Sequence, residues 1–251
     1  MSDVSEDVDE REWGRIEERL EALQRRRGLA PSRCAEIDAL LRLDFVHASI
    51  ALDGNGLARE EVEHVLATGE AIGGKSVSDH LEALDQHQAF DVMLRLAHGD
   101  QPLREADLRH LHAALLGRSR PESAGRYREG ARTVEGSLTT FPEPSEIEGL
   151  VSELVAWLSA QPAEARVAIE AHERLVSIQP FEDGNGRAAR LLMNLLLLRG
   201  GYPLLVVGPE QRAAYHASLE AVQLGGPSGP YERLMLGRLV ASFDRYLEGA
   251  S

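Results

Sequence analysis

The chain has 251 residues, a formal net charge of −14 at pH 7 and a single cysteine, Cys34. The negative charge opposes nonspecific binding to nucleic acids and to anionic lipids, and one cysteine excludes an intrachain disulfide. No apolar run approaches the roughly 20 residues that a membrane-spanning helix needs, and the first residues lack the basic and apolar regions of a secretory signal, so we expect a cytoplasmic, globular protein.

The spacing of apolar residues predicts an almost entirely helical protein. Residues 1–10 are acidic, and we expect them to be disordered. Trp13, Ile16, Leu20 and Leu23 recur at three- and four-residue steps, which predicts a helix to about residue 27. Its apolar stripe needs a partner, either the core or a second subunit, so a homo-oligomer stays open. Further helices are expected over residues 31–52, 57–68, 77–98, 105–116, 145–160, 163–178, 188–199, 209–223 and 230–248.

One segment departs from the helical pattern. Residues 132–134 and 138–141 flank a Glu-Gly-Ser turn, which predicts a short β-hairpin within 132–141. The exposed edge of such a hairpin could pair with an extended segment of a target protein through main-chain hydrogen bonds. A surface hairpin without a binding role is the alternative.

Segment Gln179–Arg190 reads Gln-Pro-Phe-Glu-Asp-Gly-Asn-Gly-Arg-Ala-Ala-Arg and precedes an apolar run that predicts a buried helix. Glycine permits positive φ angles, so Gly184, Asn185 and Gly186 can turn successive backbone N–H groups toward one anion. The N-terminus of the following helix adds free N–H groups and a partial positive charge, which favour a phosphate. We therefore expect an anionic ligand at this loop.

Charged side chains around the same loop extend this interpretation. Arg187 and Arg190 lie three residues apart, so both guanidinium groups should project from one side of the helix toward phosphate oxygens. Asp183 could hold a Mg²⁺ ion that bridges those oxygens. Taken alone, the Glu-Asp-Gly-Asn-Gly string is more typical of a solvated turn. The two arginines and the apolar helix favour the phosphate site.

The segment resembles the motif of the Fic (Fido) family, in which a histidine is followed by a phenylalanine two residues on, an acidic residue, Gly-Asn-Gly-Arg and a second arginine. The resemblance implies an all-α Fic fold with a small β-hairpin flap, in which Phe181 packs beneath the loop. Most such proteins transfer AMP from ATP to a protein hydroxyl, which implies Mg²⁺, ATP and a protein target docked at the flap. The resemblance to the family extends over roughly residues 38–245. It includes further similar stretches at residues 74–76, 79–82, 125–128, 171–176, 191–195 and 201–203.

The resemblance also implies a domain organisation. Residues 11–70 would form N-terminal helices, and residues 71–251 would form the Fic core with its C-terminal helices.

The chain departs from the family pattern at Gln179, which stands where the family has its catalytic histidine. An amide does not titrate near neutral pH and cannot take a proton from a target hydroxyl. General acid–base catalysis contributes about 10²- to 10⁴-fold, so the usual reaction should be impaired while ligand binding is kept. His172 lies seven residues earlier in the chain, and we expect it to support the core rather than replace the base.

A second motif, Ser49-Ile50-Ala51-Leu52-Asp53-Gly54-Asn55, resembles the inhibitory motif of Fic proteins whose inhibitory helix precedes the core. In the family its acid, usually glutamate, pairs with the second arginine of the main motif, here Arg190. Asp53 is one methylene shorter, which implies a weaker contact or one bridged by water. The Gly-Asn-Gly that follows Leu52 and Asp53 is also an ordinary way to end a helix.

Three functions stay open. The first is an AMP transferase in which Asp183 holds Mg²⁺, Gly184–Gly186 bind phosphates, Arg187 and Arg190 neutralise charge, and Gln179 orients the acceptor. The second is a nucleotide-binding pseudoenzyme in which ATP shifts the helix of Asp53 and signals to a partner. The third is a different phosphate-group chemistry with a nucleophile that brings its own reactivity, such as an amine or a carboxylate.

Overall fold

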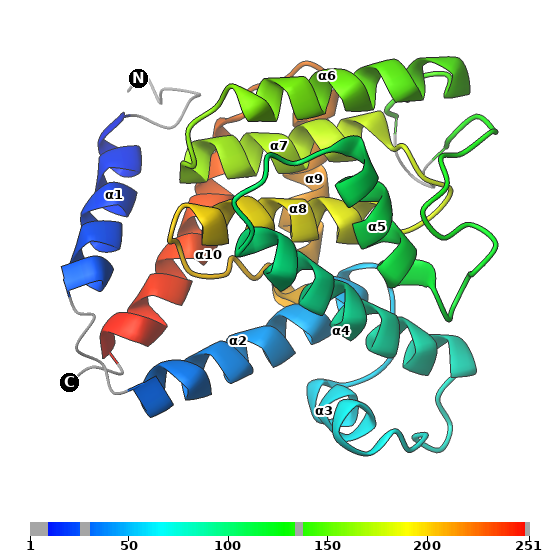
Figure 1. The fold of residues 1–251 in the computed structure, drawn as a ribbon, viewed down its shortest axis with the longest axis horizontal. Helices are drawn as coiled ribbons and strands as arrows, with labels where there is room; N and C mark the ends of the chain where they lie inside the picture. Colours follow the sequence, from blue (N-terminus) through cyan, green and yellow to red (C-terminus); the bar gives the residue numbers. More distant parts are fainter. Residues whose placement is uncertain (1–9, 26–30, 134–137, 249–251) are drawn as a thin grey trace.

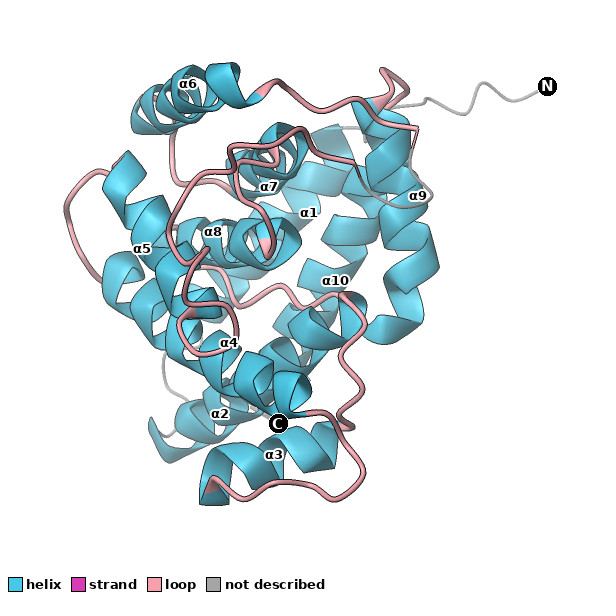
Figure 2. Ribbon diagram, turned by 90° about the vertical axis from the view of Figure 1, so that its right-hand side faces the viewer, coloured by secondary structure: helices cyan, strands magenta, loops and turns pink. Residues whose placement is uncertain are grey.

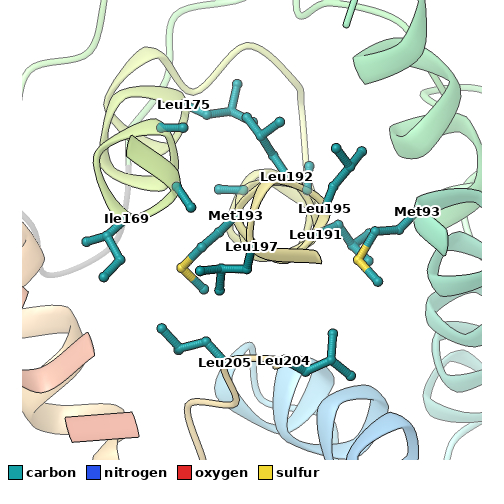
Figure 3. Close-up of a cluster of buried hydrophobic side chains, with 14 of the residues drawn as sticks. Met93, Ile169, Leu175, Leu191, Leu192, Met193, Leu195, Leu197, Leu204 and Leu205 are labelled. Carbon is teal, nitrogen blue, oxygen red and sulfur yellow. The ribbon is translucent and has the colours of Figure 1, made fainter. Parts of the chain in front are cut away.

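Helix α8, which spans Asn185–Arg199, lies at the centre of the protein (Figure 1). Its apolar side chains point in several directions into the core (Figure 3), and Leu191, Leu192, Leu195 and Leu197 are fully buried. A helix that is apolar around most of its circumference has to be covered on most sides. The predicted buried helix after the glycine-rich loop is therefore confirmed.

The computed structural model describes residues 10–25, 31–133 and 138–248, with the backbone alone for residues 31–36. Within these ranges, no helix is both long and apolar enough to cross a membrane. The remaining α-helices are α1 (Glu10–Arg25), α2 (Pro31–Leu52), α3 (Arg59–Thr68), α4 (Val77–Ala97), α5 (Glu105–Leu116), α6 (Ile147–Ser159), α7 (Ala165–Ile178), α9 (Arg212–Gln223) and α10 (Gly229–Glu248), with short 3₁₀ helices η1 (Pro144–Glu146) and η2 (Pro209–Gln211).

Helices α7, α4 and α5 pack directly on α8, and α2 contacts it near its first turns. Around α8 lie Ile169 and Leu175 of α7, Met93 of α4, and Leu204 and Leu205 of the following segment (Figure 3). Helix α6 covers α7 at one outer edge of the molecule, while α3 lies at the opposite edge beside α2 and α4 (Figure 2). The start of α8, and with it the loop that precedes it, therefore lies among packed helices.

The apolar stripe of α1 packs against this chain's own core. Trp13, Ile16 and Leu20 are buried, and α1 lies along α10 (Figure 1). An ion pair between Arg19 and Asp244 holds the two helices together at their surface. The core therefore supplies the partner that the stripe required.

The predicted helices are found with small shifts at their ends. The shift that matters most for the site is at the start of α8, which begins at Asn185 rather than at the predicted residue 188. Gly184 supplies the left-handed residue before it, with φ 73°, a conformation that glycine adopts at little cost. The Asn-Gly-Arg part of the motif is therefore the first turn of the helix. Of the predicted disordered segment, Glu10 begins α1, and residues 1–9 lie outside the described residues.

The predicted β-hairpin is not seen. Within the described part of 132–141, residues 132–133 and 138–141 have no regular structure, while 134–137 lie outside the described residues. The backbone N–H of Leu138 donates to the carboxylate of Glu220 on α9 at 2.7 Å, and the Thr139 hydroxyl donates to Gln223 at 3.3 Å. Side chains of α9 thus contact the described part of this segment. The all-α fold is confirmed without the flap strands.

We expect Leu195→Ala to lower the free energy of unfolding by about 2–5 kcal/mol, because it opens a cavity beside a fully buried helix. Chemical denaturation measures this directly. Leu40→Ala is the matched control, since Leu40 is 54% exposed on α2 and its truncation should cost about 0.5 kcal/mol or less. Equal losses in the two variants would contradict the central position of α8.

Candidate functional site

The motif begins where α7 ends. Gln179 has left-handed backbone angles, φ 48° and ψ 56°, and its N–H donates to the carbonyl of Leu175. Among the described residues it is the only non-glycine residue with positive φ. Pro180 follows and cannot continue the helix because it lacks an N–H. The chain therefore turns sharply at Gln179 and enters the loop that leads to α8.

Asn185 fastens this loop through its side chain. Its Oδ1 accepts the N–H of Phe181 at 2.9 Å, and its Nδ2 donates to the carbonyl of Phe181 at 2.8 Å. The first helical hydrogen bond of α8 joins Ala188 N–H to Gly184, so the N–H groups before Ala188 have no partner within the helix. The side chain of Asn185 shapes the loop, and only backbone N–H groups are left for an anion.

Phe181 is 1% exposed and stacks on His112 of α5, with ring centroids 3.6 Å apart and planes 4° from parallel. His112 Nδ1 accepts the N–H of Gly125 at 3.0 Å, so Nε2 carries the proton and donates to the carbonyl of Asp183 at 2.9 Å. Burial, reinforced by Arg187, lowers the pKa of His112 to about 4. A neutral histidine that the sequence did not single out therefore supports the loop from below.

Arg128 supports the other side of the loop. Its guanidinium is 4% exposed and donates to the carbonyls of Gln179 at 2.8 Å, Gly130 at 2.7 Å and Pro142 at 2.5 Å. Burial lowers the pKa of Arg128, as expected where neutral carbonyls replace water around a cation. Arg128 thus ties the motif to the segment on either side of residues 134–137.

Arg187 and Arg190 converge on one carboxylate. Asp53 at the end of α2 places Oδ2 3.2 Å from Arg187 Nε and Oδ1 3.1 Å from Arg190 Nη2. Arg190 also donates to the hydroxyl of Ser49 at 3.0 Å and to its carbonyl at 2.7 Å. Burial acts to lower the pKa of Arg190, but Asp53 and Tyr215 raise it above its ordinary value.

The expected pairing of Asp53 with Arg190 is therefore present in the structure, and the contact is direct although aspartate is the shorter acid. Asp53 also reaches Arg187, a contact that the sequence did not indicate.

The turn after Asp53 is anchored on α4. Gly54 has φ 99°, a conformation suited to glycine. Asn55 donates through Nδ2 to the carbonyl of Asp79 at 3.1 Å and to Glu82 at 2.9 Å, and its Oδ1 accepts the N–H of Leu57 at 3.1 Å. Gly54 and Asn55 thus hold Asp53 in place and do not line the cleft below the loop.

Asp183 is the acidic group of the loop. Its Oδ2 lies 3.2 Å from Arg187 Nη2 and 3.5 Å from Arg120 Nε. Burial would raise the pKa of Asp183, but Arg187, the N–H of Gly184 and Arg120 together bring it below its ordinary value. Asp183 is therefore ionised near neutral pH.

A cleft of about 520 Å³ opens beside this loop, within the size range of small-molecule sites. It brings together most of the residues that the sequence selected, while Phe181, Ser49 and Arg187 are buried and are not among its lining residues. Helix α9 supplies a wall that the sequence did not predict, including His216, whose pKa is lowered by burial. The lining residues are Leu52, Asp53, Arg132, Phe141, Val176, Gln179, Asp183, Gly184, Asn185, Gly186, Arg190, Arg212, Tyr215, His216, Leu219, Glu220 and Gln223.

Several buried polar atoms at or beside this cleft have no hydrogen-bond partner in the described protein: Gln179 Oε1, Arg187 Nε and Nη1, Arg132 Nε, and Gln223 Nε2. Arg187 Nε has its ion pair with Asp53. Gln179 is 7% exposed and Arg187 is 3% exposed. Because leaving a buried donor or acceptor unpaired costs about 1–3 kcal/mol, a ligand that supplies an anion and a donor would satisfy Arg187 Nη1 and Gln179 Oε1.

A larger hollow of about 840 Å³ lies between α2, α10 and the segment before η2. None of the motif residues lines it. The smaller cleft is the functional candidate because the charged groups and the unpaired atoms converge there.

Residues 102–197 match the Fic/DOC family. This range runs from the start of α5 to near the end of α8 and includes the whole motif loop. The chain therefore contains a Fic/DOC family domain, and the resemblance inferred from the motif is confirmed at the level of the family.

Two curated relatives are adenylyltransferases by name. The chain is 30% identical over 254 residues to protein adenylyltransferase Fic of Culex quinquefasciatus, an alignment that covers 99% of this chain and 50% of that protein. It is 33% identical over 211 residues to protein adenylyltransferase fic-1 of Caenorhabditis elegans, covering 81% and 41% respectively. The chain thus spans about half the length of the curated relatives that it matches.

Solved structures share the fold. Fic-1 from C. elegans superposes with a TM-score of 0.82 at 27% identity, over 94% of this chain and 72% of that one. A Fic domain containing signaling protein from Bacteroides thetaiotaomicron superposes with a TM-score of 0.83 at 25% identity, over 95% and 96%. The arrangement of helices around α8 is therefore that of known Fic proteins.

The buried histidines predict a loss of stability in acid. The pKa of His112 is lowered from 6.5 to about 4, so between these values the unfolded chain binds a proton that the folded chain does not. The contribution of His112 to stability is therefore constant above about pH 7 and falls as the pH drops from 6.5 toward 4. We expect His112 to contribute a slope of about 1.4 kcal/mol per pH unit.

Urea unfolding between pH 7 and 4.5 measures this slope. His112→Gln should reduce the slope, even if it also lowers stability at pH 7. His110→Gln, at an exposed position of the same helix, should leave it as in the parent chain. An unchanged slope in His112→Gln would contradict a neutral, buried His112.

Proposed function

We propose that the cleft binds ATP with Mg²⁺ and that the chain has the scaffold of a protein AMP transferase whose standard reaction is impaired by Gln179. The observation that carries the proposal is the unpaired, buried Nη1 of Arg187 beside Arg190 at the start of α8. A buried guanidinium N–H needs an acceptor, and phosphate oxygens are suited to its planar geometry. The relatives named as adenylyltransferases favour ATP as the donor of that phosphate.

The local backbone is compatible with phosphate. A side chain on Gly186 would place its Cβ 3.0 Å from Arg190 Nη1, so glycine keeps the approach to this guanidinium open. The N–H groups at the start of α8 and the positive end of the helix dipole favour an anion at the same place. In this proposal Gly184, Asn185 and Gly186 contribute backbone N–H groups, and Phe181 supports the loop from below.

Asp183 fits a Mg²⁺ ion carried in with the nucleotide. Its carboxylate lines the cleft and is ionised near neutral pH. Mg²⁺ in nucleotide sites is commonly held by one or two carboxylates together with substrate phosphates. When bound, the ion would neutralise charge on the phosphate oxygens. Asp183 would then exchange its contacts with Arg187 and Arg120 for the ion, which would free both guanidinium groups for phosphate.

Gln179 would hold the acceptor rather than activate it. Its side-chain amide is buried at the cleft with Oε1 unpaired, so it could accept a hydrogen bond from a hydroxyl or an amine of the target. It cannot take the proton away. We therefore expect slow transfer or none to hydroxyl groups. An acceptor that needs no general base, such as an amine or a carboxylate, would be less affected.

A target protein would approach along residues 132–141. Leu138 is 82% exposed in this segment, and the segment borders the cleft through Arg132 and Phe141. An extended target segment could use main-chain hydrogen bonds there, as the predicted flap would.

A nucleotide-sensing pseudoenzyme is the second candidate function, and the double contact of Asp53 favours it. Phosphates and Asp53 would compete for Arg187 and Arg190, so nucleotide binding would release the end of α2. A ligand that prefers one of two states shifts the balance between them. In this reading Ser49 and Asp53 form the sensing contact and no transfer is required.

Competition between Asp53 and ATP gives a direct prediction. Asp53→Asn removes the charge that occupies both arginines, so we expect the affinity for Mg²⁺-ATP to rise about 5- to 150-fold, the range of typical coupling free energies. Calorimetric titration measures it. Asp44→Asn is the control, since Asp44 lies on α2 and pairs with Arg59 and Arg245, none of which lines the cleft. A rise in both variants, or in neither, would argue against the competition.

The transferase scaffold is tested by restoring the base. Gln179→His should gain transfer of AMP to itself or to an added hydroxyl-bearing protein, by about 10²- to 10⁴-fold over the parent chain. Intact-mass analysis after incubation with Mg²⁺ and ATP detects each added AMP. Gln101→His, at an exposed loop position, should gain nothing.

The other outcomes of this experiment also decide between functions. AMP on the unchanged chain would mean catalysis without the histidine, and His216→Ala would then test whether the histidine of α9 supplies the base. Tight ATP binding without transfer in any variant would favour the sensing function. No nucleotide binding at all would overturn the proposal.

A further inference from the structure

A chain of hydrogen-bonded side chains runs from Arg190 into the core, on the side away from Asp53. Arg190 Nη1 lies 3.4 Å from the Tyr215 hydroxyl, which lies 2.8 Å from His172 Nε2. His172 Nδ1 lies 2.7 Å from the Tyr231 hydroxyl, which donates to the carbonyl of Ile169 at 3.2 Å. Tyr215, His172 and Tyr231, here called the buried relay, are 1%, 0% and 2% exposed.

One arrangement of hydrogens gives every group in the relay a partner. In it the Tyr231 hydroxyl donates to the carbonyl of Ile169, and the Tyr231 oxygen accepts from His172 Nδ1–H. A neutral histidine with a proton on Nδ1 has an acceptor at Nε2, which takes the hydroxyl hydrogen of Tyr215. The oxygen of Tyr215 is then left to accept from Arg190, whose guanidinium can only donate.

The protonation states required by this order agree with the surroundings. Burial, with a further effect of Arg190, lowers the pKa of His172 to about 3, so the ring carries one proton rather than two at neutral pH. Burial also raises the pKa of Tyr215 and of Tyr231, so both hydroxyls keep their hydrogens. One consistent arrangement of hydrogens therefore satisfies all the groups between Arg190 and Ile169.

The relay joins the four helices that meet behind the cleft. His172 belongs to α7, Arg190 to α8, Tyr215 to α9 and Tyr231 to α10. The centre of the Arg190 guanidinium also lies 6.0 Å from the centre of the Tyr215 ring, within the range of a cation–π contact. Arg190 is thus contacted by Tyr215, which lines the cleft and is tied to His172 and Tyr231 in the core.

We propose that the buried relay positions Arg190 for the terminal phosphates of the nucleotide when Asp53 no longer holds it. This inference rests on the proposed nucleotide function, since it assigns the relay a role in the same site. Ser49 and Asp53 hold the guanidinium from α2, and nucleotide binding would loosen that contact. The oxygen of Tyr215 accepts a hydrogen bond from Arg190 whether Asp53 or a nucleotide phosphate holds the other side of the guanidinium.

Tyr231 gives the sharpest test because it does not line the cleft. Tyr231→Phe removes one oxygen and leaves His172 Nδ1–H without its acceptor. The proton then favours Nε2, where the Tyr215 oxygen can accept it. The Tyr215 hydroxyl hydrogen loses its acceptor and turns toward Arg190, so a donor faces a donor. A change at the far end of the relay should therefore reach the phosphate site.

Calorimetry with Mg²⁺-ATP and with AMP measures the effect on the nucleotide. Since Arg190 would act on the terminal phosphates, the parent chain should bind ATP more tightly than AMP. Tyr231→Phe should reduce this preference roughly tenfold, the order expected for a weakened hydrogen bond to a charged group. Tyr202→Phe is the matched control, because Tyr202 is 3% exposed and donates its hydroxyl to Glu17 outside the relay.

The tautomer of His172 is a second readout that needs no ligand. ¹⁵N NMR of the imidazole should show the proton on Nδ1 in the parent chain and in Tyr202→Phe, and on Nε2 in Tyr231→Phe. A general loss of packing would not move the proton in this way.

The outcomes separate the relay from the proposed function. If the parent chain shows no preference for ATP over AMP, the assignment of Arg190 to the terminal phosphates fails, and the role of the relay fails with it. If the preference exists and Tyr231→Phe keeps it as Tyr202→Phe does, the relay is overturned while the nucleotide site stands. A proton on Nε2 of His172 in the parent chain would also overturn the relay.

Discussion

Two buried arginines that share one carboxylate determine how the rest of the site is built. Arg187 and Arg190 are 3% and 2% exposed, and a buried cation without a partner would cost several kcal/mol. Asp53 contacts both, and Asp183 adds a contact to Arg187. The positive charges of the two arginines are neutralised by carboxylates that line the cleft, not by groups in the core. A ligand that brings its own negative charge can therefore replace these carboxylates without leaving an arginine unpaired.

The fold brings these partners together from distant parts of the chain. Asp53 and Arg190 are 137 residues apart in sequence, and they meet because the end of α2 lies against the first turns of α8. His112 and Arg128 fix the motif loop from below and from the side, while the buried relay holds Arg190 from behind. Buried contacts thus hold both the loop and Arg190 beside the cleft. Such preorganisation favours binding, since fewer groups must be ordered when a ligand arrives.

The sequence predicted the helices and the motif residues of the cleft because local patterns encode them, but it did not predict the wall that α9 supplies. Apolar spacing located α8, and the Gly-Asn-Gly-Arg string located the loop before it. The sequence did not predict contacts that depend on tertiary packing. Arg128 lies in a stretch that resembles the family, but its contacts with carbonyls could not be predicted from that stretch. His112 has no sequence pattern of its own, because its ring is placed by stacking on Phe181. Asp53 contacts both arginines because of where α2 ends relative to α8, which the sequence does not indicate. The predicted hairpin is not shown in the described part of residues 132–141, where side chains of α9 hold Leu138 and Thr139.

A crystal structure of the chain with Mg²⁺ and a non-hydrolysable ATP analogue tests the central claim most directly, namely that Asp53 and phosphate share the same two arginines. We expect phosphate oxygens within hydrogen-bond distance of Arg187 Nη1 and Arg190, and an Asp53 carboxylate that has moved away from at least one of them. A triphosphate bound at the start of α8 with both Asp53 contacts intact would contradict the competition. A nucleotide bound elsewhere, such as in the hollow between α2 and α10, would contradict the site itself.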